Sequence, residues 1–117
     1  MADDIQKTVQ EYTTIQQQVQ MVMAQRQQLD AQIKETENAL VELDKATGST
    51  YRFVGSVMMQ MDKETLKKDL QNEKEDLAGR SEFLERQEKK ITERFVSIRK
   101  KLEELAKAQQ ASGQLGG

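Results

Sequence analysis

Residues 3–47 carry apolar side chains at alternating spacings of three and four positions. The row consists of Ile5, Thr8, Tyr12, Ile15, Val19, Val22, Arg26, Leu29, Ile33, Thr36, Leu40 and Leu43, and nine of these twelve positions are apolar. Such a repeat is typical of a helix in a coiled coil. Asp3 or Asp4 can cap the start of the helix. Lys45 followed by Gly48 is a typical helix end, so one long helix is predicted over residues 3–47.

A second heptad row lies in the other half of the chain. Its members recur every seven residues and are Leu70, Leu77, Leu84, Ile91, Ile98 and Leu105. A partner row begins with Leu66 and returns as Phe95 and Leu102, and its central positions are assigned to the polar residues Glu73, Arg80 and Gln87. Because Asp62 is a good N-cap, a helix is predicted over residues 62–110, with a looser middle.

Gly79 weakens this middle further, by ~1 kcal/mol relative to Ala. After the helix, residues 112–117 read Ser-Gly-Gln-Leu-Gly-Gly and have no periodicity. We expect this tail to be disordered.

Between the helices, residues 50–61 read Thr-Tyr-Arg-Phe-Val-Gly-Ser-Val-Met-Met-Gln-Met. The segments 50–54 and 57–61 are rich in β-branched and aromatic residues or Met, which favours strands. Gly55-Ser56 is a two-residue turn of type II′. The sequence therefore predicts a β-hairpin with Val54 opposite Val57 and Phe53 opposite Met58.

Both faces of this hairpin are partly apolar. One face carries Val54, Val57, Met59 and Met61, and the other carries Tyr51, Phe53 and Met58. An isolated two-stranded hairpin is marginal in water, and exposed apolar faces make it worse. We therefore predict that it joins other subunits. The predicted assembly residues are Tyr51, Phe53, Val54, Gly55, Val57, Met58, Met59 and Met61.

The two heptad rows match when the chain folds back at residue 55. This fold places Ile5 beside Leu105, Val19 beside Ile91 and Leu40 beside Leu70. We predict a mainly α fold, in which a long antiparallel two-helix coiled coil carries one central β-hairpin. Residues 1–111 form a single domain.

Composition excludes several classes of function. The chain has no Cys and no His among its 117 residues, so thiol chemistry, disulfides, most zinc sites and imidazole catalysis are excluded. No Gly-rich phosphate loop is present. We expect no catalytic residues, no cofactor and no metal. The start Met1-Ala2-Asp3-Asp4 is not expected to be a signal peptide, and no apolar run approaches membrane-spanning length. Together with the absence of Cys, this favours the cytoplasm.

A basic cluster in the second helix is a candidate nucleic-acid surface. It consists of Lys89, Lys90, Arg94, Arg99, Lys100 and Lys101. Five acidic residues interrupt the eight basic residues of the stretch 84–107, and the net charge of the chain is −2. A solvated coiled-coil face is the better interpretation, so neither nucleic acid nor membrane is expected as a partner.

Apolar residues at the ends of the two helices form a candidate interaction site. The candidate tip residues are Ile5, Val9, Tyr12, Ile98, Leu102 and Leu105. Fraying of the helix ends would expose them. Other apolar residues off the heptad rows are Met21, Met23, Val41, Phe83 and Val96, and these fit the flanks of a coiled coil.

Three segments of the sequence resemble a known family. They are the hairpin Tyr51-Arg52-Phe53-Val54-Gly55, the helix start Met61-Asp62-Lys63-Glu64, and the stretch Leu84-Glu85-Arg86-Gln87-Glu88-Lys89-Lys90. In this order, between two long helices, they resemble a β-type subunit of prefoldin, because α-type subunits carry two hairpins. A short chain without Cys favours an archaeal β subunit, while a eukaryotic β-type relative stays open.

The resemblance implies a function and partners. Prefoldin hairpins join an inter-subunit β-barrel platform in a hetero-hexamer of two α and four β subunits. The tips hold unfolded polypeptides without ATP and transfer them to a group II chaperonin. The alternative is a structural coiled-coil scaffold or tether that binds no client, and an RNA- or DNA-binding helical hairpin is a third.

Overall fold

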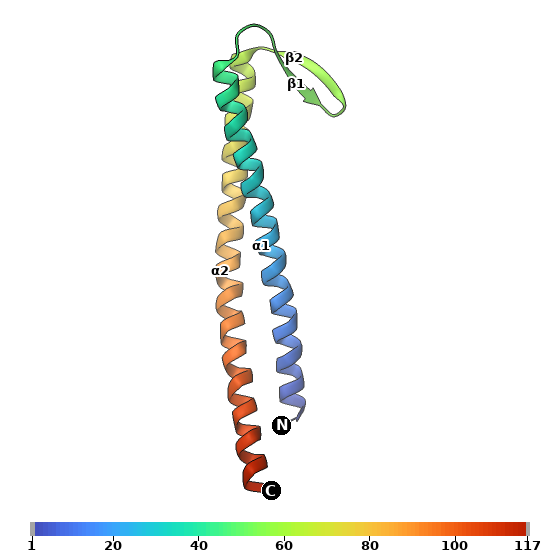
Figure 1. Ribbon diagram of the computed structural model, residues 1–117, viewed down its shortest axis with the longest axis vertical. Coiled ribbons are helices and arrows are strands. Elements are labelled where there is room, and N and C mark those ends of the chain that lie inside the picture. Colours follow the sequence, from blue (N-terminus) through green and yellow to red (C-terminus); the bar gives the residue numbers. More distant parts are fainter. Residues whose placement is uncertain (1, 117) are drawn as a thin grey trace. The chain divides into compact units, whose positions relative to one another are not determined.

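The computed structural model describes the backbone of residues 2–116 and the side chains of residues 3–111. Helix α1 (Ala2–Lys45) is followed by strands β1 (Thr50–Val54) and β2 (Val57–Met61) and by helix α2 (Lys63–Gly116), as Figure 1 shows. The predicted mainly α fold with a central antiparallel hairpin is confirmed. Helix α2 continues through residues 112–116, past the predicted helix end at residue 110, so the described backbone does not show the predicted disordered tail.

The chain divides into two compact units. The terminal unit comprises Met1–Gln25 and Leu84–Gly117, and the hairpin unit comprises Arg26–Phe83. Each unit contains a segment of α1 and a segment of α2. The unit that holds both strands positions the assembly residues, and the other holds the candidate tip residues.

All twelve predicted row positions of α1 are buried or half-buried. Ile15, Val22 and Leu43 are its most buried apolar members. The polar members also fit, because the hydroxyl of Thr8 donates a 2.7 Å hydrogen bond to the Asp4 carbonyl and that of Thr36 donates a 2.9 Å bond to Gln32. A threonine that bonds to its own helix can occupy a buried row without an unsatisfied hydroxyl. The heptad row of α1 is therefore confirmed.

The partner row of α2 differs from the prediction. Arg80 and Gln87 are exposed, and Ser81 and Glu88 are half-buried in their place. From Ser81 onward, the row therefore runs in the same 4-3 pattern as Phe95 and Leu102. Only Glu73 among the three predicted polar members is half-buried. The heptad row therefore continues through the middle of α2 with polar members, whereas the sequence predicted that it is interrupted there.

In the hairpin unit, three polar contacts join the helices at intervals of seven residues. They are Asp44 Oδ1 to Lys67 Nζ at 3.1 Å, Glu37 Oε1 to Lys74 Nζ at 3.5 Å, and Asp30 Oδ1 to Ser81 Oγ at 2.9 Å. Ascending positions on α1 meet descending positions on α2, so the two segments run antiparallel. The antiparallel direction is the one that the predicted pairing of Leu40 with Leu70 requires.

Side chains at the start of α2 and just before it stabilise the connections around the hairpin. Asp62 caps α2, since its Oδ2 accepts a 3.2 Å hydrogen bond from the Thr65 backbone N–H. Lys63 reaches back to the end of α1, where its Nζ donates to the carbonyls of Ala46 at 3.1 Å and Asp44 at 3.4 Å. A cation at a helix C-terminus satisfies carbonyls that lack intrahelical partners and complements the helix dipole. This cap explains why α1 ends at Lys45, two residues before the predicted end.

Lys63→Met should therefore weaken the connection between α1 and the hairpin. We expect the free energy of unfolding to fall by about 0.5–1 kcal/mol, because two carbonyls lose a charged donor. Urea unfolding followed by circular dichroism measures the change. Lys68→Met, at an exposed position of the same helix, is the control. Equal stability of the two variants would show that Lys63 caps nothing.

Candidate assembly and client-binding surfaces

The hairpin has the predicted register. Val54 pairs with Val57, Phe53 with Met58, Arg52 with Met59 and Tyr51 with Gln60. Gly55 has a φ of 63°, and no residue other than Gly has positive φ among the described residues. Positive φ at the first central residue alone is the pattern of a type II′ turn. The predicted turn is thus confirmed, and its glycine adopts a backbone conformation that L side chains rarely take.

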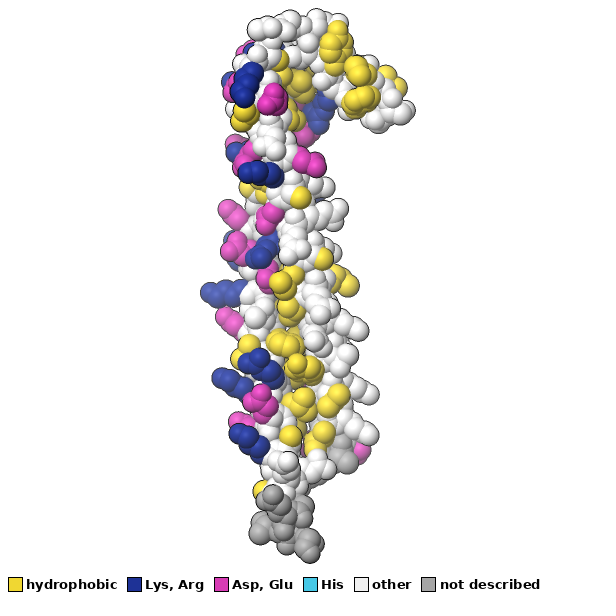
Figure 2. Space-filling view, viewed as in Figure 1, with side chains coloured by type: hydrophobic (Ala, Val, Ile, Leu, Met, Phe, Trp, Pro, Cys, Tyr) yellow, Lys and Arg dark blue, Asp and Glu magenta, His cyan; other side chains and the backbone are white. Residues whose placement is uncertain are grey.

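The apolar side chains of the hairpin are open to solvent. The exposed fraction lies between 50% and 65% for Tyr51, Phe53, Val54, Val57, Met58 and Met59. Met61 is half-buried and Gly55 is exposed. Figure 2 shows these apolar side chains gathered at the hairpin. No other described part of the chain covers them, which is the arrangement expected of a surface that another molecule covers.

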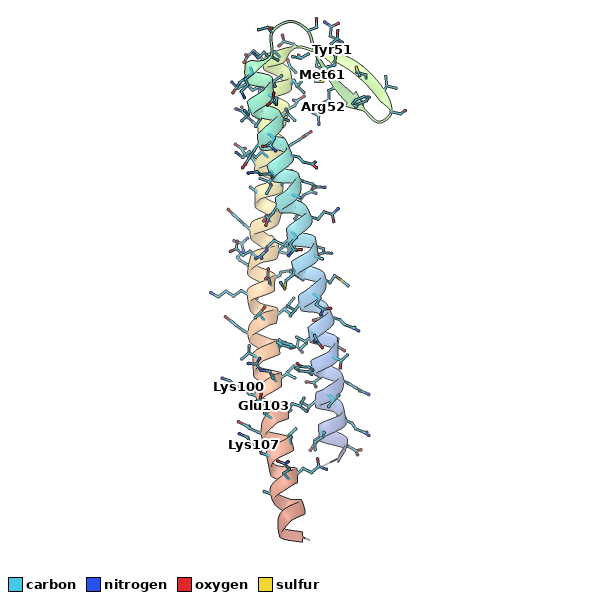
Figure 3. All side chains as sticks on the ribbon, in the orientation of Figure 1. Tyr51, Arg52, Met61, Lys100, Glu103 and Lys107 are labelled. Atoms are coloured by element: carbon cyan, nitrogen blue, oxygen red, sulfur yellow. The ribbon has the colours of Figure 1, made fainter. Side chains whose placement is uncertain are left out.

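Side chains at the base of the hairpin join its strands to each other and to α2. Thr50 is buried, and its hydroxyl donates a 2.6 Å hydrogen bond to the carbonyl of Met61, across the two strands. Arg52 extends from β1 and forms an ion pair with Glu73 of α2. Figure 3 labels Tyr51, Arg52 and Met61 where the strands leave the helices.

A largely apolar groove of about 450 Å³ lies between the hairpin and the helices of the same unit. Its helix side includes Leu43, Leu66 and Leu70, and its hairpin side includes Tyr51 and Phe53. The side chains of Tyr51 and Phe53 therefore belong both to the exposed hairpin surface and to the groove. Because the two surfaces are continuous, a partner that covers the hairpin can also fill the groove.

The structure places the candidate tip residues in two environments, both within the terminal unit. The rings of Tyr12 and Phe95 stack with centroids 5.0 Å apart, and Ile98 is only 8% exposed. Val9, in contrast, is 43% exposed. The half-buried tip residues are Ile5, Leu102 and Leu105. Val9 is therefore accessible from solvent, whereas Ile98 is covered by the helix pairing.

The charged face of α2 has the mixed character that the sequence predicted. All six residues of the basic cluster are exposed. Lys100, Glu103 and Lys107 project from one side of α2 in Figure 3, so acidic and basic groups alternate along it. Within residues 3–111, no group of three or more Asp or Glu side chains is placed to hold a metal ion. No described helix is long and apolar enough to cross a bilayer.

Sequence reasoning identified the hairpin residues but missed the partner of Arg52. The available signal was Glu73, a charged residue in a row of coiled-coil positions. It also misplaced two members of that row, although counting back by sevens from Phe95 leads to Glu88, Ser81 and Lys74.

Comparison with known proteins gave matches to a family model and to solved structures. A family model described as "Prefoldin subunit" matches residues 6–109. The crystal structure of the prefoldin beta subunit from Thermococcus strain KS-1 is similar with a TM-score of 0.80 and 27% sequence identity, over 87% of this chain and 91% of that chain. A search of curated proteins gave no significant match.

Proposed function

Because this chain belongs to the prefoldin subunit family and has the fold of its β-type subunits, we propose that it serves in an ATP-independent chaperone that holds non-native proteins. The observation that carries the proposal is the hairpin, whose six large apolar side chains are at least half exposed. In an isolated subunit this apolar surface would stay exposed to solvent. Other prefoldin subunits carry hairpins that could cover it.

Assembly proceeds through the hairpins. Strands of neighbouring subunits pair at the open edges of β1 and β2 and close a β-barrel platform, which removes unpaired edges and covers both faces. The partners are α-type subunits and further copies of this chain, in a hexamer of two α and four β subunits. Filling of the groove beside Leu43 and Leu66 adds apolar area to the same contact.

Client binding uses the tip residues of several subunits together. Each tip offers a small apolar surface, of which Val9 is accessible and Ile5, Leu102 and Leu105 are half-buried. One such contact is weak, but linked contacts bind with high effective concentration. The held polypeptide is then transferred to a group II chaperonin in the cytoplasm. No catalytic group takes part, since holding requires only reversible burial of apolar surface.

The proposal is tested by suppression of client aggregation. The chain is co-expressed with its α-type partner, and the purified complex is added to a chemically denatured protein on dilution. We expect light scattering to fall as the complex approaches the client in molar amount, equally with and without ATP. An assembled complex that leaves the scattering unchanged would contradict client holding and favour the structural scaffold. Scattering that falls only with ATP would contradict the ATP-independent mechanism.

A further inference from the structure

The ion pair between Arg52 and Glu73 joins a cation on a partly apolar hairpin face to a carboxylate in a coiled-coil row. Arg52 lies in β1 on the hairpin face that also carries Val54 and Met59, and its side chain is 30% exposed. Glu73 lies in α2, 44% exposed, on the row where Leu66 is buried. A carboxylate is a poor choice for a coiled-coil row, because an apolar residue there would stabilise the helix pairing more. Its contact with Arg52 accounts for both polar residues.

Few other polar side chains hold the hairpin in place. Among residues 3–111, this ion pair is the polar side-chain contact that joins the strands to a helix. The bond from Thr50 to Met61 lies within the hairpin itself, and that from Gln60 to Ser49 links it to the preceding connection. The neighbouring cation Lys74 is engaged with Glu37 of α1. The direction of the hairpin relative to α2 therefore depends strongly on Arg52.

The ion pair also lies beside the groove. Arg52 lines it together with Tyr51 and Phe53 from the hairpin, opposite Leu66 and Leu70 of α2. A hairpin released from Glu73 could fold its apolar side chains onto these leucines, since burial of apolar area is favourable. Such a collapsed hairpin would hide the surface that partners use. The ion pair fixes the hairpin at one angle to α2, at which its apolar side chains stay exposed.

We propose that Arg52 and Glu73 are positioning residues that hold the hairpin in an assembly-competent orientation and keep the groove open for a partner subunit. This inference rests on the proposed assembly through the hairpin. The ion pair contributes little to the stability of the helices, since exposed pairs contribute little. Its effect is to raise the fraction of chains that are ready to bind, and affinity falls in proportion when that fraction falls.

Charge reversal tests the pair in the complex with its α-type partner. Arg52→Glu and Glu73→Arg should each weaken association by about two- to fivefold per interface, measured by dilution and native mass spectrometry. The double variant Arg52→Glu/Glu73→Arg should restore association to within about twofold of the original chain. Arg80→Glu is the matched control, because Arg80 pairs with Asp76 on the exposed surface of the same helix.

Hydrogen exchange separates positioning from general stability. In the single variants, amides of β1 and β2 should exchange faster while those of α1 and α2 keep their protection. Loss of protection along the helices would show a structural role and overturn the proposal. Single variants that assemble like Arg80→Glu, or a double variant as weak as the singles, would also overturn it.

Failure of the underlying function is recognised separately. Phe53→Ser with Met58→Ser removes apolar area from the hairpin without touching the ion pair. If that variant assembles normally, the hairpin is not the interface, and both the proposed assembly and this inference are wrong. If it fails to assemble while the charge variants behave like the control, only the positioning role is wrong.

Discussion

A chain carrying Phe53→Ser and Met58→Ser should no longer assemble with its partner subunits. The two side chains lie directly opposite each other across the hairpin and are 65% and 58% exposed. Full burial of each contributes about 1.5–3 kcal/mol, and tenfold in affinity corresponds to about 1.4 kcal/mol. Because only the exposed part, roughly 60% of each side chain, is left to bury on association, we expect association to weaken at least about twentyfold per interface. Native mass spectrometry should show free subunits where the original chain is expected to give the proposed hexamer.

The chain offers a matched control for this double substitution. Phe83 and Met21 are also a phenylalanine and a methionine with 53% and 62% exposure, and both lie on the helices. Phe83→Ser with Met21→Ser makes the same chemical change outside the hairpin, so assembly should persist. Equal loss in both variants would point to association through the helix surfaces, as in a coiled-coil tether. The hairpin would then have no special part in assembly.

The hairpin and the α1 row could be read from the sequence because their signals are local. Gly55-Ser56 fixes the turn, and the turn fixes which residues are opposite each other, so the register followed directly. In α1, apolar members mark nine of the twelve positions, and the three polar ones could be placed by spacing. The sequence also predicted exposed hairpin side chains, because both faces of the two-stranded hairpin are partly apolar and a two-stranded sheet cannot cover both.

The α2 row could not be read in the same way because its central members are polar. Spacing from Leu66 leads to Arg80, whereas spacing from Phe95 leads to Ser81, and no apolar residue between them decides which row continues. Partners on α1 decide it, since Asp30 accepts a hydrogen bond from Ser81 at 2.9 Å. A contact between residues so distant in sequence leaves no periodic signal along the chain.

The contact of Arg52 with Glu73 could not be predicted from the sequence for a similar reason. Arg52 and Glu73 are 21 residues apart on different elements, and no periodic pattern along the chain indicates that they meet. The tip residues were identified by position alone, and the sequence did not separate the exposed Val9 from the buried Ile98.

The difference in exposure between Val9 and Ile98 decides which tip residues to substitute in a test of client holding. The triple variant Ile5→Gln, Val9→Gln and Leu105→Gln should reduce suppression of client aggregation at least about fivefold, measured as the molar ratio of complex to client at half-maximal light scattering. Glutamine keeps the helix propensity close to that of the replaced residues. In the proposed mechanism several subunits contribute weak contacts to the same client, so a loss at every tip compounds and amplifies the effect. The proposed hexamer should stay intact, since these positions lie outside the hairpin.

The choice of positions avoids the most buried and the stacked residues of the terminal unit. Ile98 is buried and Tyr12 stacks on Phe95, so polar substitutions there would destabilise helix pairing whether or not clients bind. Deletion of residues 1–12 and 102–117 would also remove the tip, but it would leave Phe95 without its stacked ring. The matched control is Met21→Gln, Met23→Gln and Val41→Gln, three exposed apolar positions away from the tip residues. If this control loses holding as strongly as the tip variant, clients bind along the helices and the tip proposal is wrong.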